Sequence, residues 1–239
     1  MAINKLLGVA VLAASIIDLG QSQEKLDCNI QSLRACGEDY VPYGHGPHLE
    51  HTGSLFTKQC ETYKQQLDCS MTYTRECAHG VTRAAVLLAL EAFQDNVDAI
   101  CINGSKQHDA FQNFVGCLNS VGSKINACFR ILRTNMQKAI VKAPANDVVH
   151  YACCSYADLI DCLDPVLTPC EEDGGKEFTV NLLEQVFGEM LSLVCGNYQR
   201  GSQSCKALPK LPSPGPTDRK IEGYLELLLE IGKTLARKN

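Results

Sequence analysis

Features that define several large classes of proteins are missing from this sequence. After residue 22, no apolar stretch approaches the ~20 residues that a membrane-spanning helix requires, and the run from Ala84 to Leu90 ends after seven residues. No run of lysine and arginine is present and the net charge is −5, so nothing favours nucleic-acid binding. No stretch alternates between apolar and polar residues as a half-buried strand does. The sequence is therefore that of a mildly acidic chain for which we predict no membrane-spanning helix after residue 22, no nucleic-acid binding and no strand.

Motifs of catalysis and of phosphate binding are also missing. There is no Gly-x-x-x-x-Gly-Lys loop, and no Ser-His-Asp or Cys-His group stands in a recognisable context. The stretch Cys153-Cys-Ser-Tyr-Ala-Asp158 is similar to the Cys-Cys-x-x-His-Asp helix of secreted calcium-dependent phospholipases. Ala157, however, occupies the position of the histidine base and cannot accept a proton, while His150 lies on the other side of the cysteine pair. We therefore predict no catalytic residue and no cofactor.

Cysteine, in contrast, is abundant. An even number of cysteines in an exported chain predicts seven disulfides and no free thiol. Structural zinc, the alternative, would require paired Cys-x-x-Cys motifs, and the sequence has none. In the chain-entropy model, each bond that closes a loop of ~15 residues contributes about 3 kcal/mol, so crosslinks are expected to dominate stability. The fourteen cysteines are Cys28, Cys36, Cys60, Cys69, Cys77, Cys101, Cys117, Cys128, Cys153, Cys154, Cys162, Cys170, Cys195 and Cys205.

Residues 1–22 predict a secretory signal peptide. Lys5 supplies a positive charge, Leu6 to Ile17 is almost entirely apolar, and small residues occupy the −3 and −1 positions of a cleavage after Ser22. Asp18 ends the apolar run before it reaches the length of a membrane anchor, the alternative interpretation. The sequence therefore predicts a secreted protein.

Helical periodicity predicts an all-α fold, in which residues 23–206 form a disulfide-rich bundle of about five to seven helices. Gly116 and Gly122 are expected to kink the longest helix. Cys117 and Cys128, eleven residues apart, are expected to face the same way because their spacing is about three helical turns. The predicted helical segments are Glu24–Cys36, Leu55–Leu67 with Thr52 or Ser54 as cap, a short turn with Cys69 and Cys77, Thr82–Cys101 with Thr82 as cap, Phe111–Ile140, the hub helix with Asn146 or Asp147 as cap and Pro165 as its end, and Phe178–Cys195.

The segment Tyr151–Cys170 holds four cysteines in twenty residues, and we predict that it is the hub of the fold. The adjacent Cys153 and Cys154 are not expected to bond to each other, because that small ring strains the disulfide geometry. On a helix, successive side chains point about 100° apart. Each of the two cysteines should therefore reach a different part of the chain. The sequence does not identify the two partner cysteines, because fourteen cysteines allow a very large number of pairings.

Beyond the last cysteine the sequence predicts a tether and a terminal helix. Residues 207–218 contain four prolines and are expected to be an extended, solvated linker. Residues 219–239 are expected to form an amphipathic helix, which either folds back onto the core or docks onto a partner or a membrane. Its apolar face is Ile221, Tyr224, Leu225, Leu228, Ile231 and Leu235, and its polar face is Glu222, Glu226, Glu230, Lys233 and Arg237.

Three groups of polar side chains are candidates for metal binding: Asp158, Asp161 and Asp164; Glu171 to Asp173; and His45, His48 and His51. Carboxylates spaced by three residues could bind calcium, but such a set more often forms the solvent-exposed face of a helix. The acidic triplet Glu171 to Asp173 is predicted to be an exposed turn. Three imidazoles could bind zinc or copper, but Gly46 and Pro47 break any helix that would align them. We predict no metal site.

Asn103-Gly-Ser105 is the one Asn-x-Ser/Thr sequon after the predicted signal peptide. It falls in a predicted turn between two helices, where an oligosaccharide can be attached. We predict glycosylation of Asn103.

Four phrases of the sequence resemble a known family. They are Cys28-Asn-Ile-x-x-Leu-x-x-Cys36, Val41-Pro-Tyr-Gly44, Tyr151-x-Cys-Cys-x-Tyr156 and Ala207-Leu-Pro-Lys-Leu-Pro212. The pattern resembles a family of secreted, cysteine-rich arthropod proteins, which are similar to helical cysteine-rich extracellular domains of nematodes. The resemblance covers Cys28 to Pro212 and implies a helical fold and secretion. That family has no established activity, so the resemblance supplies no catalytic residues.

Together, these observations predict a secreted, non-enzymatic binding or interaction protein, with an extracellular protein or a small apolar molecule as its partner. The first alternative is a carrier of small apolar ligands, because helical bundles can enclose cavities between their helices. The second alternative is a component of venom or saliva.

Overall fold

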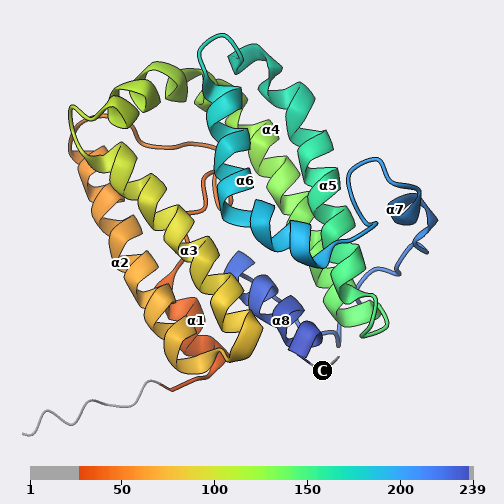
Figure 1. Cartoon of the computed structure of the whole chain (residues 1–239). Coiled ribbons are helices and arrows are strands. Elements are labelled where there is room, and N and C mark those ends of the chain that lie inside the picture. The colour runs from red at the N-terminus through yellow and green to blue at the C-terminus, as the bar shows by residue number, and fades with distance from the viewer. Residues whose placement is uncertain (1–26, 237–239) are drawn as a thin grey trace, which may run out of the picture.

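The apolar periodicity of the chain is realised as helices throughout the part that the structure describes. This computed structural model describes residues 27–236, so the predicted signal peptide at 1–22 lies outside the described residues. No strand occurs between 27 and 236, which confirms the predicted all-α, disulfide-rich fold. The elements are α1 (Ile30–Cys36), α2 (Gly53–Cys77), α3 (Gly80–Cys101), α4 (Lys106–Lys142), α5 (Val148–Leu167), the 3-10 helix η1 (Thr168–Cys170), α6 (Gly175–Val194), α7 (Gln203–Ala207) and α8 (Tyr224–Ala236) (Figure 1).

The long helix α4 forms the centre of the bundle. Its residues Phe111, Leu118, Ile125, Leu132 and Ala139 recur every seven positions and are all buried, as expected for one continuous face of a helix. That face packs closely along α5, and α2 and α3 form a second helical pair beside it (Figure 1). Helix α6 crosses α3 and contacts α4 and α5. The core therefore lies between the two pairs, with α6 over it.

Seven disulfides crosslink this bundle, and no cysteine is free in the described chain. Cys153 bonds to Cys195 at the end of α6, while Cys154 bonds to Cys205 in α7, which confirms that the adjacent pair joins two different segments to α5. Cys117 and Cys128 also turn the same way, toward η1 and α5. The pairs are Cys28–Cys77, Cys36–Cys69, Cys60–Cys101, Cys117–Cys170, Cys128–Cys162, Cys153–Cys195 and Cys154–Cys205.

Two predicted helix boundaries on the N-terminal side were wrong. Helix α2 continues without interruption to Cys77, because the stretch after Leu67 holds no glycine or proline and buries Met71 and Tyr73. Helix α3 begins at Gly80 with His79 as its N-cap residue. Thr82 therefore does not cap α3. It lies inside the first turn and is buried against α8, where its side chain faces Gly232.

Pro165 does not end α5, contrary to the prediction. The helix continues to Leu167 and passes directly into η1. A proline inside a helix removes one hydrogen bond, here the one to the carbonyl of Asp161. Because Asp161 and Pro165 are both exposed, water can satisfy that carbonyl, and the buried Leu163 and Leu167 on the opposite side hold the last turn in place.

The C-terminal helix follows the first of its two predicted alternatives and folds back into the core. Helix α8 packs against α3, α4 and α5, and it starts at Tyr224, three residues later than the predicted stripe. The carboxylate of Glu38 accepts hydrogen bonds from the backbone N–H groups of Tyr224 (2.7 Å) and Leu225 (3.0 Å). Glu38 thereby caps the helix from a loop almost two hundred residues earlier in the chain.

Glu226 lies inside the protein rather than on the predicted polar face of α8. Its side chain is 2% exposed and accepts hydrogen bonds from the Arg34 guanidinium, from Nε to Oε2 at 3.0 Å and from Nη2 to Oε1 at 3.2 Å. This two-pronged pair satisfies a carboxylate that would otherwise be costly to bury. It also ties α8 to α1.

The segment 208–223 contains no helix or strand and is mostly exposed. It is held along the bundle by a hydrogen bond from Tyr151 Oη to the carbonyl oxygen of Pro209 (2.8 Å) and by an ion pair between Lys142 and Asp218 (2.7 Å). The proline-rich segment thus follows the surface from α7 to α8.

Within residues 27–236, no helix is long and apolar enough to cross a lipid bilayer. Seven disulfides in a chain of this size are typical of a protein that folds in an oxidising compartment.

Candidate functional site

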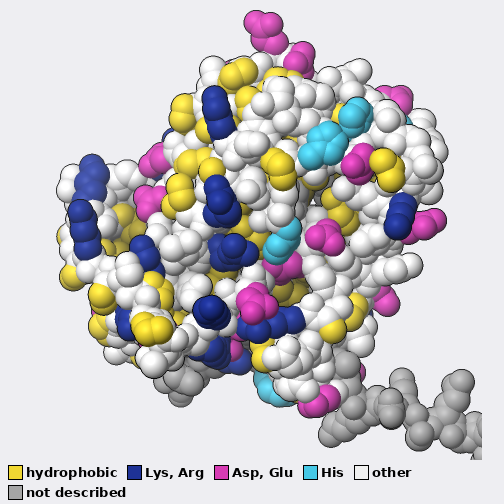
Figure 2. All heavy atoms as spheres, turned by 180° about the vertical axis from the view of Figure 1, so that it is seen from behind, with side chains coloured by type: hydrophobic (Ala, Val, Ile, Leu, Met, Phe, Trp, Pro, Cys, Tyr) yellow, Lys and Arg dark blue, Asp and Glu magenta, His cyan; other side chains and the backbone are white. Residues whose placement is uncertain are grey.

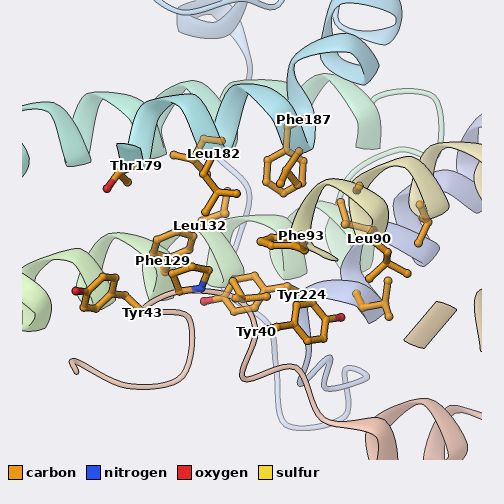
Figure 3. A pocket seen from close by; sticks show the side chains of 18 of the residues that line it. Tyr40, Tyr43, Leu90, Phe93, Phe129, Leu132, Thr179, Leu182, Phe187 and Tyr224 are labelled. Carbon is orange, nitrogen blue, oxygen red and sulfur yellow. The ribbon is translucent and has the colours of Figure 1, made fainter. Parts of the chain in front are cut away.

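Helix α6 lies over the core and is crosslinked only outside its two ends. It is crosslinked just before its start, through Cys170 to Cys117, and just after its end, through Cys195 to Cys153. No cysteine occurs in between. Some of its apolar side chains point down toward α3, α4 and α8, as Leu182 and Phe187 show in Figure 3. The fit beneath this helix is incomplete.

Two adjacent cavities lie beneath α6, with volumes of about 50 Å³ and about 80 Å³. Side chains from α3, α4, α6 and α8 line both of them, and Ala89, Leu132, Phe187 and Tyr224 belong to both walls. Figure 3 shows the first cavity, where Leu182 and Phe187 face Phe93 and the ring of Tyr224. The shared walls make the cavities neighbouring parts of one apolar interior.

The polar atoms of the surrounding tyrosines are turned away to partners in the protein. The Tyr40 hydroxyl donates to Ser70 Oγ (3.3 Å), and the Tyr43 hydroxyl donates to Asn119 Oδ1 (3.0 Å). The Tyr156 hydroxyl donates to the Leu183 carbonyl (3.4 Å), and the Tyr224 hydroxyl donates to the Gly44 carbonyl (3.2 Å). Burial raises the pKa of all four, to about 12 for Tyr156 and Tyr224. They therefore stay neutral at physiological pH and present only ring faces and edges to the cavities.

A larger groove of about 590 Å³ lies between α5 and α6 and opens to solvent. It shares Tyr156 and Leu191 with one cavity and Leu183 with the other. The Tyr156 ring also packs edge-on against Phe187, with ring centroids 5.7 Å apart. Tyr156, Leu183 and Leu191 thus form a thin apolar partition between the open groove and the enclosed interior.

Charged side chains form one end of the groove. Lys176 pairs with Asp164 (2.9 Å), and Arg200 binds both Asp161 (2.5 Å) and Asp164 (3.5 Å). The hydrogen bond from Lys176 is the main reason that the pKa of Asp164 lies below its usual value, and the same contact raises the pKa of Lys176. All four groups are at least partly exposed, so these pairs add little to stability. They add charged groups to a groove whose other walls combine apolar side chains with the polar Glu184, Ser192 and Gln199.

The polar groups considered from the sequence do not come together as metal sites. Asp161 pairs with Arg200, and Asp164 pairs with both Lys176 and Arg200. The pKa of Asp158 is raised, mainly because its carboxyl group is partly buried. His45 contacts the Glu38 carboxylate at 3.0 Å, while the rings of His48 and His51 lie 6.3 Å apart. The described residues contain no group of three or more histidine, cysteine or acidic side chains arranged to hold a metal ion.

The segment Cys153–Asp158, which is similar to the phospholipase helix, has alanine at the position of the histidine base. Ala157 is buried in α5. His150, at the start of α5, stacks on Tyr198 with a centroid distance of 4.0 Å and contacts Asp147. The His150 imidazole therefore contacts Tyr198 and Asp147 at the edge of the bundle.

Sequence reasoning did not find the cavities, although one signal was present. The apolar stripe of α3 includes Ala85 and Ala89 between larger side chains, and both alanines line the interior. A small residue at a buried stripe position leaves space unless a neighbour fills it. Which neighbours face α3 depends on packing partners that the sequence pattern does not identify.

Comparisons of the chain with protein-family models, with curated proteins and with solved structures found no match. The resemblance to secreted arthropod proteins therefore stays a prediction, and the groove and cavities have to be interpreted from their own chemistry.

Asn103 lies in an exposed turn between α3 and α4, while Ser105 of the same sequon caps α4 by accepting a hydrogen bond from the His108 N–H (2.9 Å). We expect Asn103→Gln to remove a glycan, seen as a mobility shift of the secreted protein, without loss of the cap. Ser105→Ala should remove both, so its free energy of unfolding should be about 1 kcal/mol lower than that of Asn103→Gln. Ser105→Thr, which keeps sequon and cap, is the control. Equal stability of the two unglycosylated variants, or no glycan on the wild type, would count against this assignment.

Proposed function

We propose that the protein is a secreted, non-enzymatic binding protein that carries a small apolar ligand in the interior beneath α6. The observation that supports this proposal is the chemistry of the cavity walls. Tyrosine is the only titratable residue type in the walls apart from the disulfide-bonded Cys153, and the four tyrosine hydroxyls are bonded to protein atoms. A molecule bound there gains apolar contact and is offered no charged partner.

The size of the cavities limits what they can hold in this conformation. Pockets for typical small ligands have volumes of roughly 300 to 1,000 Å³, whereas the two cavities have about 50 Å³ and about 80 Å³. A ligand with more than a few carbon atoms therefore requires α6 to move outward. The 24 residues between Cys170 and Cys195 have no crosslink to oppose that movement.

The groove between α5 and α6 supports a route of entry. It has about 590 Å³ and is separated from the interior by side chains of Tyr156, Leu183 and Leu191. Two of these are leucines, and Tyr156 is held by one long hydrogen bond of 3.4 Å and by the edge-on contact with Phe187. In the proposed mechanism the apolar part of the ligand lies first in the groove, and rotation of these side chains then admits it beneath α6.

A fluorescent fatty-acid displacement assay tests the proposal. We expect saturable binding at micromolar protein, displaced by unlabelled fatty acid. Ala89→Leu adds three carbon atoms to a residue that lines both cavities, so it should abolish binding while the helical circular dichroism is retained. Ala84→Leu places the same change on the exposed side of α3 and should bind as the wild type does. Absence of saturable binding, or equal binding by the two variants, would contradict the proposal.

A further inference from the structure

Basic side chains gather on α4 although the chain as a whole is acidic. Between Asp109 and Asp147 the sequence contains no aspartate or glutamate, while the whole chain has 27 acidic residues and a net charge of −5. Five cations fall in this acid-free stretch: Lys124, Arg130, Arg133, Lys138 and Lys142. After Asp109 in its first turn, α4 thus carries no acidic residue.

Helix geometry spreads the five cations over about half of the circumference of α4: Lys124, Lys138 and Lys142 fall within about 40° of one another, and Arg130 and Arg133 lie about 120° and 180° from Lys124. The face with Leu118, Ile125 and Leu132 is buried in the core, so the cations are left on the outer half of α4. No two of them are adjacent in the sequence, which is why no basic run is evident there. Lys124 and Lys142 are eighteen residues apart, or about 27 Å along a helix. We call this row the α4 basic face; Figure 2 shows lysine and arginine side chains on the back of the molecule, with acidic side chains among them.

Most of this positive charge is not neutralised by the protein. Among the described residues, Lys142 is the one member of the row with an ion pair, to Asp218 at 2.7 Å. Arg133 donates a hydrogen bond to the backbone carbonyl of Glu222 (3.3 Å), which leaves its charge uncompensated. Lys124 and Arg130 are exposed. Free cations at a rigid surface can each attract an anionic group of a partner.

The segment after α7 extends the basic face. Residues 202–220 carry Lys206, Lys210, Arg219 and Lys220, with Asp218 as the single acid. This segment lies beside α4, because Gln137 Nε2 donates to the carbonyl oxygen of Arg219 (3.3 Å). Arg219 is paired with Glu230 (3.0 Å), so Lys220 is the cation of this segment that the contact places beside α4 without an ion pair in the described chain.

We propose that the α4 basic face binds a linear, sulfated polysaccharide of the extracellular matrix. The exposed cations on the outer half of a rigid helix can each contact one of the regularly spaced anions of an extended chain. Single-stranded nucleic acid fits less well, since it needs aromatic side chains for base stacking, and the rings of Phe111, Phe114 and Phe129 on α4 are buried. A membrane also fits less well, because Ile131 is the one large apolar side chain of α4 that is substantially exposed.

The proposal is independent of the apolar interior and has its own test. The glycosylated, disulfide-bonded protein is applied to immobilised heparin at low salt and eluted with a salt gradient. We expect the wild type to be retained. Lys124→Gln/Arg130→Gln/Lys138→Gln should weaken heparin binding about tenfold or more, because the attraction depends on unpaired, salt-screened charges. Lys58→Gln/Arg75→Gln/Arg83→Gln makes the same change of net charge on exposed positions of α2 and α3 and should elute as the wild type does.

Three outcomes would overturn the proposal. The first is a wild-type protein that passes through the heparin column at low salt. The second is an equal loss of retention in the two triple variants, which would mean that net charge alone decides binding. The third is tighter binding to phosphatidylserine vesicles or to a single-stranded oligonucleotide than to heparin, which would assign the surface to a different class of partner.

Discussion

Replacing Cys153 and Cys195 together by alanine is expected to lower the free energy of unfolding by about 4 kcal/mol. The bond closes a segment with a sequence separation of 42 residues, and the chain-entropy model attributes a stabilisation of this size to a loop of that length. The same change releases the end of α6 from α5. Urea unfolding followed by circular dichroism measures the stability, and the fatty-acid displacement assay measures the effect on the interior.

Removal of the Cys28–Cys77 bond is the matched control. Its sequence separation is 49 residues, so the loss of stability should be similar, but neither cysteine lines the cavities. We expect Cys28→Ala/Cys77→Ala to bind the apolar probe as the wild type does and Cys153→Ala/Cys195→Ala to bind it with changed affinity. Equal probe binding by the two variants would show that the anchoring of α6 does not control the interior.

Gly122→Ala is expected to lower the free energy of unfolding by about 2 kcal/mol, within the range known for overpacked sites. A Cβ atom at this position would lie 3.0 Å from the carbonyl carbon of Pro47 and closer still to its oxygen. The loop cannot easily move away, because Asn119 binds both the N–H and the carbonyl of Leu49 at 2.9 Å. The backbone of α4 and this loop therefore touch at Gly122, where no side chain keeps them apart.

Gly116→Ala, in the same helix, should have the opposite effect. A Cβ atom there would meet nothing within 4 Å, and alanine is favoured over glycine inside a helix by about 1 kcal/mol. We expect Gly116→Ala to be more stable than the wild type by about that amount in thermal or urea unfolding. If both substitutions stabilise the protein, the close approach of the loop to α4 is incorrect. If both destabilise it, glycine is needed at both positions, as the predicted kink of this helix would require.

The helices and the hub could be predicted from the sequence because both depend on local constraints. The buried face of α4 follows from apolar residues at helical spacing. That Cys153 and Cys154 bond to two different segments follows from ring strain and helix geometry. The pairing of the remaining cysteines depends on which helices are neighbours. Local patterns hold no information on that point, since many pairings of fourteen cysteines are compatible with the same helices.

The candidate site could not be predicted for a related reason. A cavity is the space left over when four helices fail to fill their common interior, so it depends on the relative positions of α3, α4, α6 and α8 rather than on any one of them. The position of α8 itself depends on two long-range contacts, Glu38 at its N-terminus and Arg34 on the buried Glu226. In the sequence, Glu226 is indistinguishable from the exposed glutamates of an amphipathic helix.

The enclosed interior depends most directly on the two adjacent cysteines of α5, which attach α6 through Cys195 and the segment leading to α8 through Cys205. Partial reduction of the purified protein, stepwise alkylation and mass spectrometry of the linked peptides assign both bonds. We expect Cys153 linked to Cys195, Cys154 linked to Cys205, and no free sulfhydryl before reduction. An exchange of these two partners, a bond between Cys153 and Cys154, or a reactive sulfhydryl in the unreduced protein would contradict the arrangement of α6 and α8 on which the proposed function rests.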